Sequence, residues 1–178
     1  LSLANTIMPT LDGDEPFWEK SAASYIAFLI AYCLEAINDD EHNMLTVCRL
    51  HQTFISPNGE ISFLQWAEKN PNSFAAKKYR QIRSSASADK MWSSIIEFAN
   101  RALEPFGFEE ASVIFEGSEP FDIRELGRNK TVLFLNVSDT DRTFDMLVNI
   151  FYTQALQLLC SQADANPDGR LRVPVRII

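Results

Sequence analysis

The chain has 178 residues, 46% of them hydrophobic, and a formal net charge of −8 at pH 7. This length suits one domain with a small appendage, and the apolar content is enough to build a core. The negative charge argues against generic nucleic-acid binding, and no stretch is long and apolar enough for a membrane span. Three widely separated cysteines without metal-ligand spacing favour a reducing cytosol. No signal peptide is visible, and the absence of an initial Met leads us to expect an excised fragment.

The first 110 residues have the pattern of successive helices. Apolar residues recur at helical spacing from Pro16 to Ile37 and again from Met44 to His51. Ser62 and Gln65 form a capping-box pattern for a third helix, and Ser73 is a good N-cap for a fourth. A fifth is predicted over residues 88–104. We therefore expect an all-helical domain at residues 15–110, after a short lead-in segment at residues 1–14.

Residues 111–178 show a different pattern. Residues 111–115 are apolar enough for a short strand, and residues 131–137 form a nearly continuous apolar run typical of a strand buried on both faces. A polar turn, a long amphipathic helix from about Met146 to Leu159 and an apolar segment at 171–178 follow. The order predicts a βαβ fragment, although such a unit needs neighbouring strands that the helical remainder does not supply. The predicted fold class is mainly α: a helical bundle with a small α/β fragment.

Few residues carry recognisable catalytic chemistry. The six glycines form none of the spacings that cradle phosphates, and no nucleophile elbow is visible. His42 and His51 are nine residues apart without a facing carboxylate pattern, so we expect exposed or helix-capping histidines and not a metal site.

The polar turn after the predicted strand is the first candidate site. Ligands gather at the carboxyl ends of strands in open parallel sheets, so Asp139, Asp141 and Arg142 are candidates for a ligand edge or a subunit contact. The alternative is a capped strand-to-helix turn without such a role.

The second candidate site is a basic island in an acidic chain. Residues 71–101 hold six basic and two acidic residues, a net charge of +4. Lys77, Lys78, Arg80 and Arg83 are candidates for contacting DNA phosphates, and the interleaved Tyr79 and Trp92 for stacking on unpaired bases. The alternative is an ordinary solvated helix face with its aromatic residues in the core.

Four sequence motifs in order resemble those of one protein family. Residues 15–22 (EPFWEKSA) resemble the start of the all-helical domain of type IV secretion coupling proteins, the TraG/TraD-like conjugation ATPases. Residues 121–126 (FDIREL) look like the family's FDLR-L segment. Residues 131–135 followed by 139–143 (DTDRT) resemble its hydrophobic strand and DTDRT stretch, and residues 173–178 look like the strand that runs into Walker B.

This resemblance implies an organisation as well as a function. In the family, the all-helical domain is inserted into a RecA-like nucleotide-binding domain between Walker A and Walker B. Residues 111–178 would then be a partial RecA-like segment that stops before Walker B. We expect the fragment to be non-catalytic and to have no cofactor of its own, whereas the full-length parent would use ATP and Mg²⁺.

The resemblance also implies partners and a location. The parent would be a bacterial protein anchored in the inner or cell membrane, a homohexameric ATPase that pumps DNA. The fragment would be a cytoplasmic part without membrane contact that helps to select the substrate. Expected partners are a relaxase or relaxosome accessory protein and single-stranded DNA, and the net charge favours a protein partner.

Two other classes of function compete with this interpretation. One is a stand-alone helical adaptor that binds proteins. The other is a small-molecule enzyme with a site at residues 139–143, which would need a more complete parallel sheet than the chain offers.

Overall fold

A computed structural model describes residues 2–9, 17–86, 88–115, 121–140 and 142–178. These residues form two compact units, residues 1–116 and residues 117–178, which we call unit 1 and unit 2. The described part of the chain is mainly helical, which confirms the larger part of the predicted fold class.

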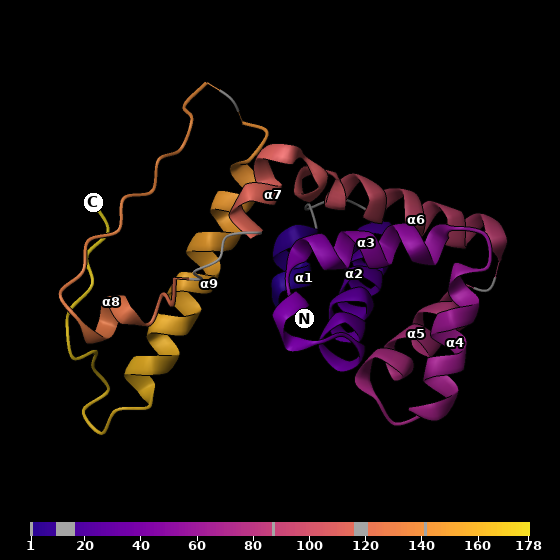
Figure 1. Ribbon diagram of the computed structural model, residues 1–178, viewed down its shortest axis with the longest axis horizontal. Helices are drawn as coiled ribbons and strands as arrows, with labels where there is room; N and C mark the ends of the chain where they lie inside the picture. The colour runs from indigo at the N-terminus through magenta and orange to yellow at the C-terminus, as the bar shows by residue number, and fades with distance from the viewer. Residues whose placement is uncertain (1, 10–16, 87, 116–120, 141) are drawn as a thin grey trace. The chain divides into compact units, whose positions relative to one another are not determined.

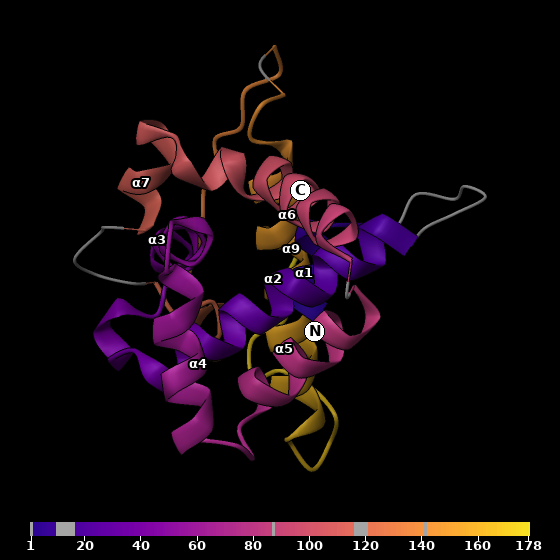
Figure 2. The same cartoon turned by 90° about the vertical axis from the view of Figure 1, so that its right-hand side faces the viewer.

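Unit 1 is a bundle built around one long helix (Figure 1). Its described elements are α1 (Ser2–Ile7), α2 (Phe17–Ala36), η1 (Asp39–Glu41), α3 (Met44–Ile55), α4 (Gly59–Lys69), α5 (Phe74–Ser85), α6 (Asp89–Leu103), η2 (Glu104–Gly107) and α7 (Glu109–Phe115). Helix α2 contacts α1, α3, α5 and α6 and runs through the middle of the bundle (Figure 2). The predicted helix at 16–37 is confirmed for residues 17–36, since residue 16 lies outside the described residues. The helices predicted from 73 onward and at 88–104 are confirmed as α5 and α6.

Aromatic rings from five helices fill the core of unit 1. Phe28 of α2 is fully buried and lies 4.7 Å from the Phe63 ring of α4, centroid to centroid. Phe54 of α3 and Tyr79 of α5 lie within 6 Å of the same Phe28 ring. The complete aromatic cluster is Tyr25, Phe28, Tyr32, Phe54, Phe63, Trp66, Tyr79 and Trp92. Its edge-to-face contacts fix how the five helices pack together.

Local sequence signals explain where two of the helices begin. Ser73 accepts the Ala76 backbone N–H at 3.0 Å, so the predicted N-cap of α5 is confirmed. The predicted capping box at Ser62 is wrong, because α4 begins earlier, at Gly59, after Asn58 with φ of 66°. A side chain at position 59 would collide with the Thr53 carbonyl oxygen, 1.7 Å from its Cβ, so only glycine fits this turn.

Unit 2 consists of α8 (Glu125–Arg128), α9 (Asp145–Asp164) and extended segments. The long predicted helix is therefore confirmed. Gly127 of α8 is buried; its carbonyl accepts the Val173 backbone N–H at 3.0 Å, and an added Cβ would lie 2.8 Å from Leu171. These contacts attach the C-terminal segment to α8.

The predicted βαβ fragment is wrong for the described residues. None of them forms a strand: residues 131–137 and 171–178 are extended but have no ladder partner, and Figure 1 draws both as coil. Residues 111–115, the third predicted strand, lie in helix α7. A strand is defined by hydrogen bonds to a neighbour, and an apolar segment without a neighbouring strand cannot form one. Phe134 and Val132 are accordingly 89% and 75% exposed.

The start of α5 is held by a carboxylate of α2. Glu35 accepts backbone N–H bonds from Phe74 at 2.9 Å and from Ala75 at 3.2 Å. Two of the N–H groups that a helix leaves unpaired at its first turn are satisfied in this way, and a negative charge is favourable at that end of a helix.

Replacing Glu35 by alanine is expected to destabilise the chain by about 1 kcal/mol, the usual cost of losing a helix cap. Urea unfolding followed by circular dichroism measures this free energy. Glu68→Ala is the matched control, because Glu68 is exposed on α4 and has no hydrogen-bond or ion-pair partner among the described residues. Equal stability losses in the two variants would contradict the capping role.

Candidate functional site

The basic island predicted from the sequence lies mainly on α5. This helix, with the sequence FAAKKYRQIRSS, contains four cations and no carboxylate. We call Lys77, Lys78, Arg80 and Arg83 the α5 basic face. Lys77 and Arg80 are exposed, whereas Lys78 and Arg83 are half-buried. On the inner side of the helix, Tyr79 is 5% exposed and belongs to the aromatic cluster.

Two members of the α5 basic face are engaged within unit 1. The Arg83 guanidinium lies 4.6 Å from the centre of the Trp92 ring and 3.6 Å from a Glu60 carboxylate oxygen. Arg80 donates a hydrogen bond to the Pro71 carbonyl oxygen. These contacts give Arg83 and Arg80 roles in holding α4, α5, α6 and the turn before α5.

Lys77 and Lys78 differ from the two arginines in this respect. Within the described part of the chain, neither lysine side chain has a hydrogen-bond or ion-pair partner. An unpaired ammonium group at a surface keeps its full capacity to bind an anion such as a phosphate. The α5 basic face therefore offers two cations whose side chains are free, and DNA contact by any of its four residues stays a prediction.

The described residues of the polar turn, 139, 140, 142 and 143, are exposed on unit 2. Asp139 is exposed, and Asp141 lies outside the described residues. Arg142 donates to the Asp145 carboxylate at 2.8 Å, and its side chain is 85% exposed. Because no strand precedes this turn among the described residues, the sheet edge that motivated the prediction is missing. A ligand or subunit role for Asp139, Asp141 and Arg142 stays a prediction.

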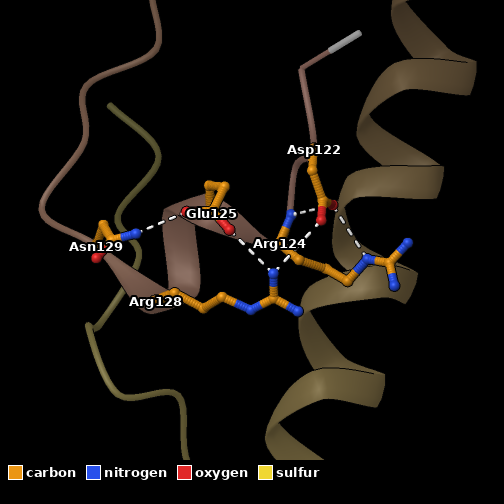
Figure 3. Close-up of polar contacts among 5 residues, drawn as sticks. All are labelled: Asp122, Arg124, Glu125, Arg128 and Asn129. Carbon is orange, nitrogen blue, oxygen red and sulfur yellow. Dashed lines mark hydrogen bonds and ion pairs between the residues drawn. The ribbon is translucent and has the colours of Figure 1, made fainter.

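Unit 2 also contains a polar cluster that was not predicted as a site from the sequence (Figure 3). Asp122 accepts from the Arg124 backbone N–H at 3.0 Å and from the Arg124 side chain at 3.1 Å. Arg128 lies 3.5 Å from Asp122 and 2.9 Å from Glu125, and Asn129 donates to Glu125 at 2.6 Å. The regular spacing of Asp122, Glu125 and Arg128 was a signal for these contacts.

The charges within this cluster stabilise one another. The backbone N–H of Arg124 lowers the pKa of the Asp122 carboxyl, with help from the Arg124 and Arg128 guanidinium groups. The hydrogen bond from Arg128 lowers the pKa of Glu125. Two carboxylates and two guanidinium groups balance in charge, so the cluster is better suited to ordering the segment before α9 than to binding an ion.

A buried hydrogen-bond chain crosses the core of unit 1. The Tyr25 hydroxyl lies 3.0 Å from Nδ1 of His51, and Nε2 of His51 lies 2.9 Å from Oδ1 of Asn100. A neutral His51 fits both contacts if Nε2–H donates to Asn100 and Nδ1 accepts from Tyr25. His51 is only 1% exposed, so the prediction of an exposed or capping histidine is wrong here. It holds for His42, whose Nε2 bonds the Ile37 carbonyl at the end of α2 at 3.0 Å.

A surface hollow of about 690 Å³ lies beside His51, with Cys48 in its lining. Burial raises the pKa of the Cys48 thiol to about 11, and both ring nitrogens of His51 are already engaged. A thiolate activated by a histidine is therefore not available in this hollow. No group of three or more potential metal ligands occurs among the described residues.

The comparisons with known proteins found one family. A family model described as "Type IV secretory system Conjugative DNA transfer" matches residues 1–176 of the chain. Searches of curated proteins and of solved structures found no match. The matched range covers unit 1 and nearly all of unit 2, so it includes both the α5 basic face and the polar cluster of Figure 3.

Proposed function

Because this chain belongs to the type IV secretory system family of conjugative DNA transfer, we propose that unit 1 recognises the transferred substrate. The family match confirms the resemblance to TraG/TraD-like coupling proteins that the sequence motifs indicated. In this proposal the chain is a non-catalytic, cytoplasmic part of a membrane-anchored, hexameric coupling ATPase. It selects a relaxase–DNA complex for delivery to the transfer channel.

In this proposal, the ATP and Mg²⁺ that the parent would use are bound by its other parts. The sequence contains no glycine-rich phosphate-binding loop, and the residues placed by the structure hold no cluster of metal-ligating side chains. We assign the nucleotide chemistry to other parts of the parent. No helix in the described part of the chain combines the length and apolarity that crossing a membrane requires.

The observation that supports a contact with DNA is that the side chains of Lys77 and Lys78 on α5 have no partner among the described residues. The chain as a whole carries a charge of −8, yet α5 has four cations and no acid. A local cationic surface on an acidic protein gives contact with a phosphate backbone while limiting binding elsewhere on the molecule.

Reversing the charge of both lysines, in the double variant K77E/K78E, is expected to weaken binding of single-stranded DNA about tenfold. The slope of log affinity against log salt should also fall by about 1.4, because each lost phosphate contact contributes about 0.7 for single strands. Fluorescence anisotropy of a labelled oligonucleotide at several salt concentrations measures both quantities. Arg80 and Arg83 are left unchanged, since their contacts help to hold the helices.

The matched control is R170E/R172E, which makes the same change in net charge at two exposed arginines of unit 2. If both double variants weaken binding equally, general repulsion and not a site on α5 explains the loss. If K77E/K78E leaves the affinity for single-stranded DNA unchanged, the α5 basic face does not contact DNA.

The net charge of the chain favours a second candidate partner, a relaxase or a relaxosome accessory protein. An acidic surface attracts basic proteins, and unit 1 exposes apolar side chains such as Leu34, Ile61 and Leu64. Capture of a purified relaxase by a chain that does not bind DNA would support protein recognition as the function. Absence of both interactions would contradict the proposed role in substrate selection.

A further inference from the structure

An exposed aromatic residue opens the α5 helix. Phe74 is 49% exposed, although it directly precedes two fully buried alanines. The two aromatic residues predicted from the sequence to stack on bases, Tyr79 and Trp92, do not present a comparably open ring. Tyr79 is buried in the aromatic cluster, and the half-buried Trp92 has the Arg83 guanidinium over its ring. On α5, Phe74 is thus the aromatic ring that a ligand can reach.

Phe74 shares its helix face with the two free lysines. Positions 74, 77, 78 and 81 follow the spacing i, i+3, i+4 and i+7, which places side chains along one face of a helix. Phe74, Lys77 and Gln81 are exposed and Lys78 is half-buried. The face therefore combines an aromatic ring, two cations and an amide that can donate or accept hydrogen bonds.

The position of Phe74 is fixed by the contact with α2. Its backbone N–H donates to Glu35 at 2.9 Å, and the next N–H along the chain donates to the other oxygen of the same carboxylate. The N–H groups that could otherwise receive a phosphate at this helix end are therefore occupied. The Glu35 charge repels phosphate near Phe74, which leaves the phosphate contacts to Lys77 and Lys78 farther along the helix.

We propose that Phe74, Lys77, Lys78 and Gln81 form a stacking platform for unpaired bases, in which Phe74 distinguishes single-stranded from double-stranded DNA. The proposal rests on the proposed function and assigns its specificity to one residue. An unpaired base stacks on the Phe74 ring, while the adjacent phosphates contact the two lysines and Gln81 hydrogen-bonds to a base edge. In a duplex the base faces are covered by their neighbours, so only the phosphate contacts remain.

The test compares three probes with the full chain by fluorescence anisotropy: an oligothymidine, a duplex of equal charge and an oligonucleotide with abasic sites. Phe74→Ala is expected to weaken binding of oligothymidine by about tenfold, within the range measured for stacking of one base. Binding of the duplex and of the abasic strand should not change. Phe74→Tyr and Phe74→Trp should restore the affinity for oligothymidine.

Leu64→Ala is the matched control, because Leu64 is a similarly exposed apolar residue on α4. An unchanged affinity of Phe74→Ala for oligothymidine, or an equal loss with all three probes, would overturn the platform. In either case a loss of binding in K77E/K78E would leave the proposed DNA contact intact. If the unaltered chain binds none of the probes, the platform is excluded, while relaxase capture still tests substrate recognition.

Discussion

Replacing Phe28 by alanine is expected to destabilise the chain by about 3–5 kcal/mol, the usual cost of removing a fully buried phenylalanine. Phe28 has no exposed surface and contacts the rings of Tyr25, Tyr32, Phe54, Phe63 and Tyr79. These neighbours come from four helices, so they cannot all move together to close the cavity. Urea unfolding of the unaltered chain and of Phe28→Ala measures the difference in the free energy of unfolding.

Phe74→Ala is a suitable control for this experiment, because it removes the same side chain from a 49% exposed position. Phe74→Ala should change the free energy of unfolding by no more than about 0.5 kcal/mol, as is usual for surface substitutions. A cost below about 1 kcal/mol for Phe28→Ala would contradict an aromatic cluster as the core of unit 1. The difference between the two phenylalanines separates burial from residue type.

Acidification is expected to destabilise unit 1 through His51. Burial lowers the pKa of this imidazole below its ordinary value of 6.5, because the charged form loses its hydration, although the bond to Asn100 opposes the shift. Below pH 6.5 the unfolded chain binds a proton that the folded chain does not. The free energy of unfolding should therefore fall by up to about 1.4 kcal/mol per pH unit until the pH reaches the lower folded pKa.

His51→Gln is expected to remove this component of the pH dependence. It should also lower stability at pH 7.5 by about 1–3 kcal/mol, because Tyr25 or Asn100 loses its hydrogen-bond partner. Urea unfolding at about pH 7.5, 6.5 and 5.5 measures both effects, and His42→Gln is the control at a half-buried histidine. If the free energy of unfolding changes with pH in the same way in the unaltered chain and in His51→Gln, a buried neutral imidazole is contradicted.

Helical periodicity predicted most of unit 1 but not its exact boundaries. The pattern from Pro16 to Ile37 matches α2, and Ser73 marks the start of α5, since both signals are local. The Ser62 capping box was misleading because Asn58 and Gly59 already form a tight turn into α4. Helix α1, at residues 2–7, was not predicted, because its apolar residues are irregularly spaced and its packing against α2 is not encoded locally.

The βαβ prediction failed for a different reason. Residues 131–137 have the composition of a buried strand, but composition does not supply a neighbour. A strand depends on hydrogen bonds to residues distant in the chain or in another part of a larger protein. Residues 131–137 have no such partner among the described residues, so they remain extended and exposed.

The candidate site was only partly predictable. The charge of residues 71–101 indicated a basic surface, but it did not reveal that Arg83 lies over Trp92 or that Arg80 bonds the Pro71 carbonyl. Those contacts join residues from different helices or turns. The exposed ring of Phe74 was likewise hidden, because an apolar residue at the start of a helix usually suggests burial. Spacing from Phe74 to Lys77 and Lys78 was the available signal.

The two units of the chain also differ in what spectroscopy can detect. All three tryptophans, Trp18, Trp66 and Trp92, lie in unit 1, and two of them belong to the aromatic cluster. Intrinsic tryptophan emission therefore reports loss of packing around α2 and is blind to events confined to unit 2. Because α9 contributes strongly to helical circular dichroism, disagreement between the two signals would reveal that the units melt separately.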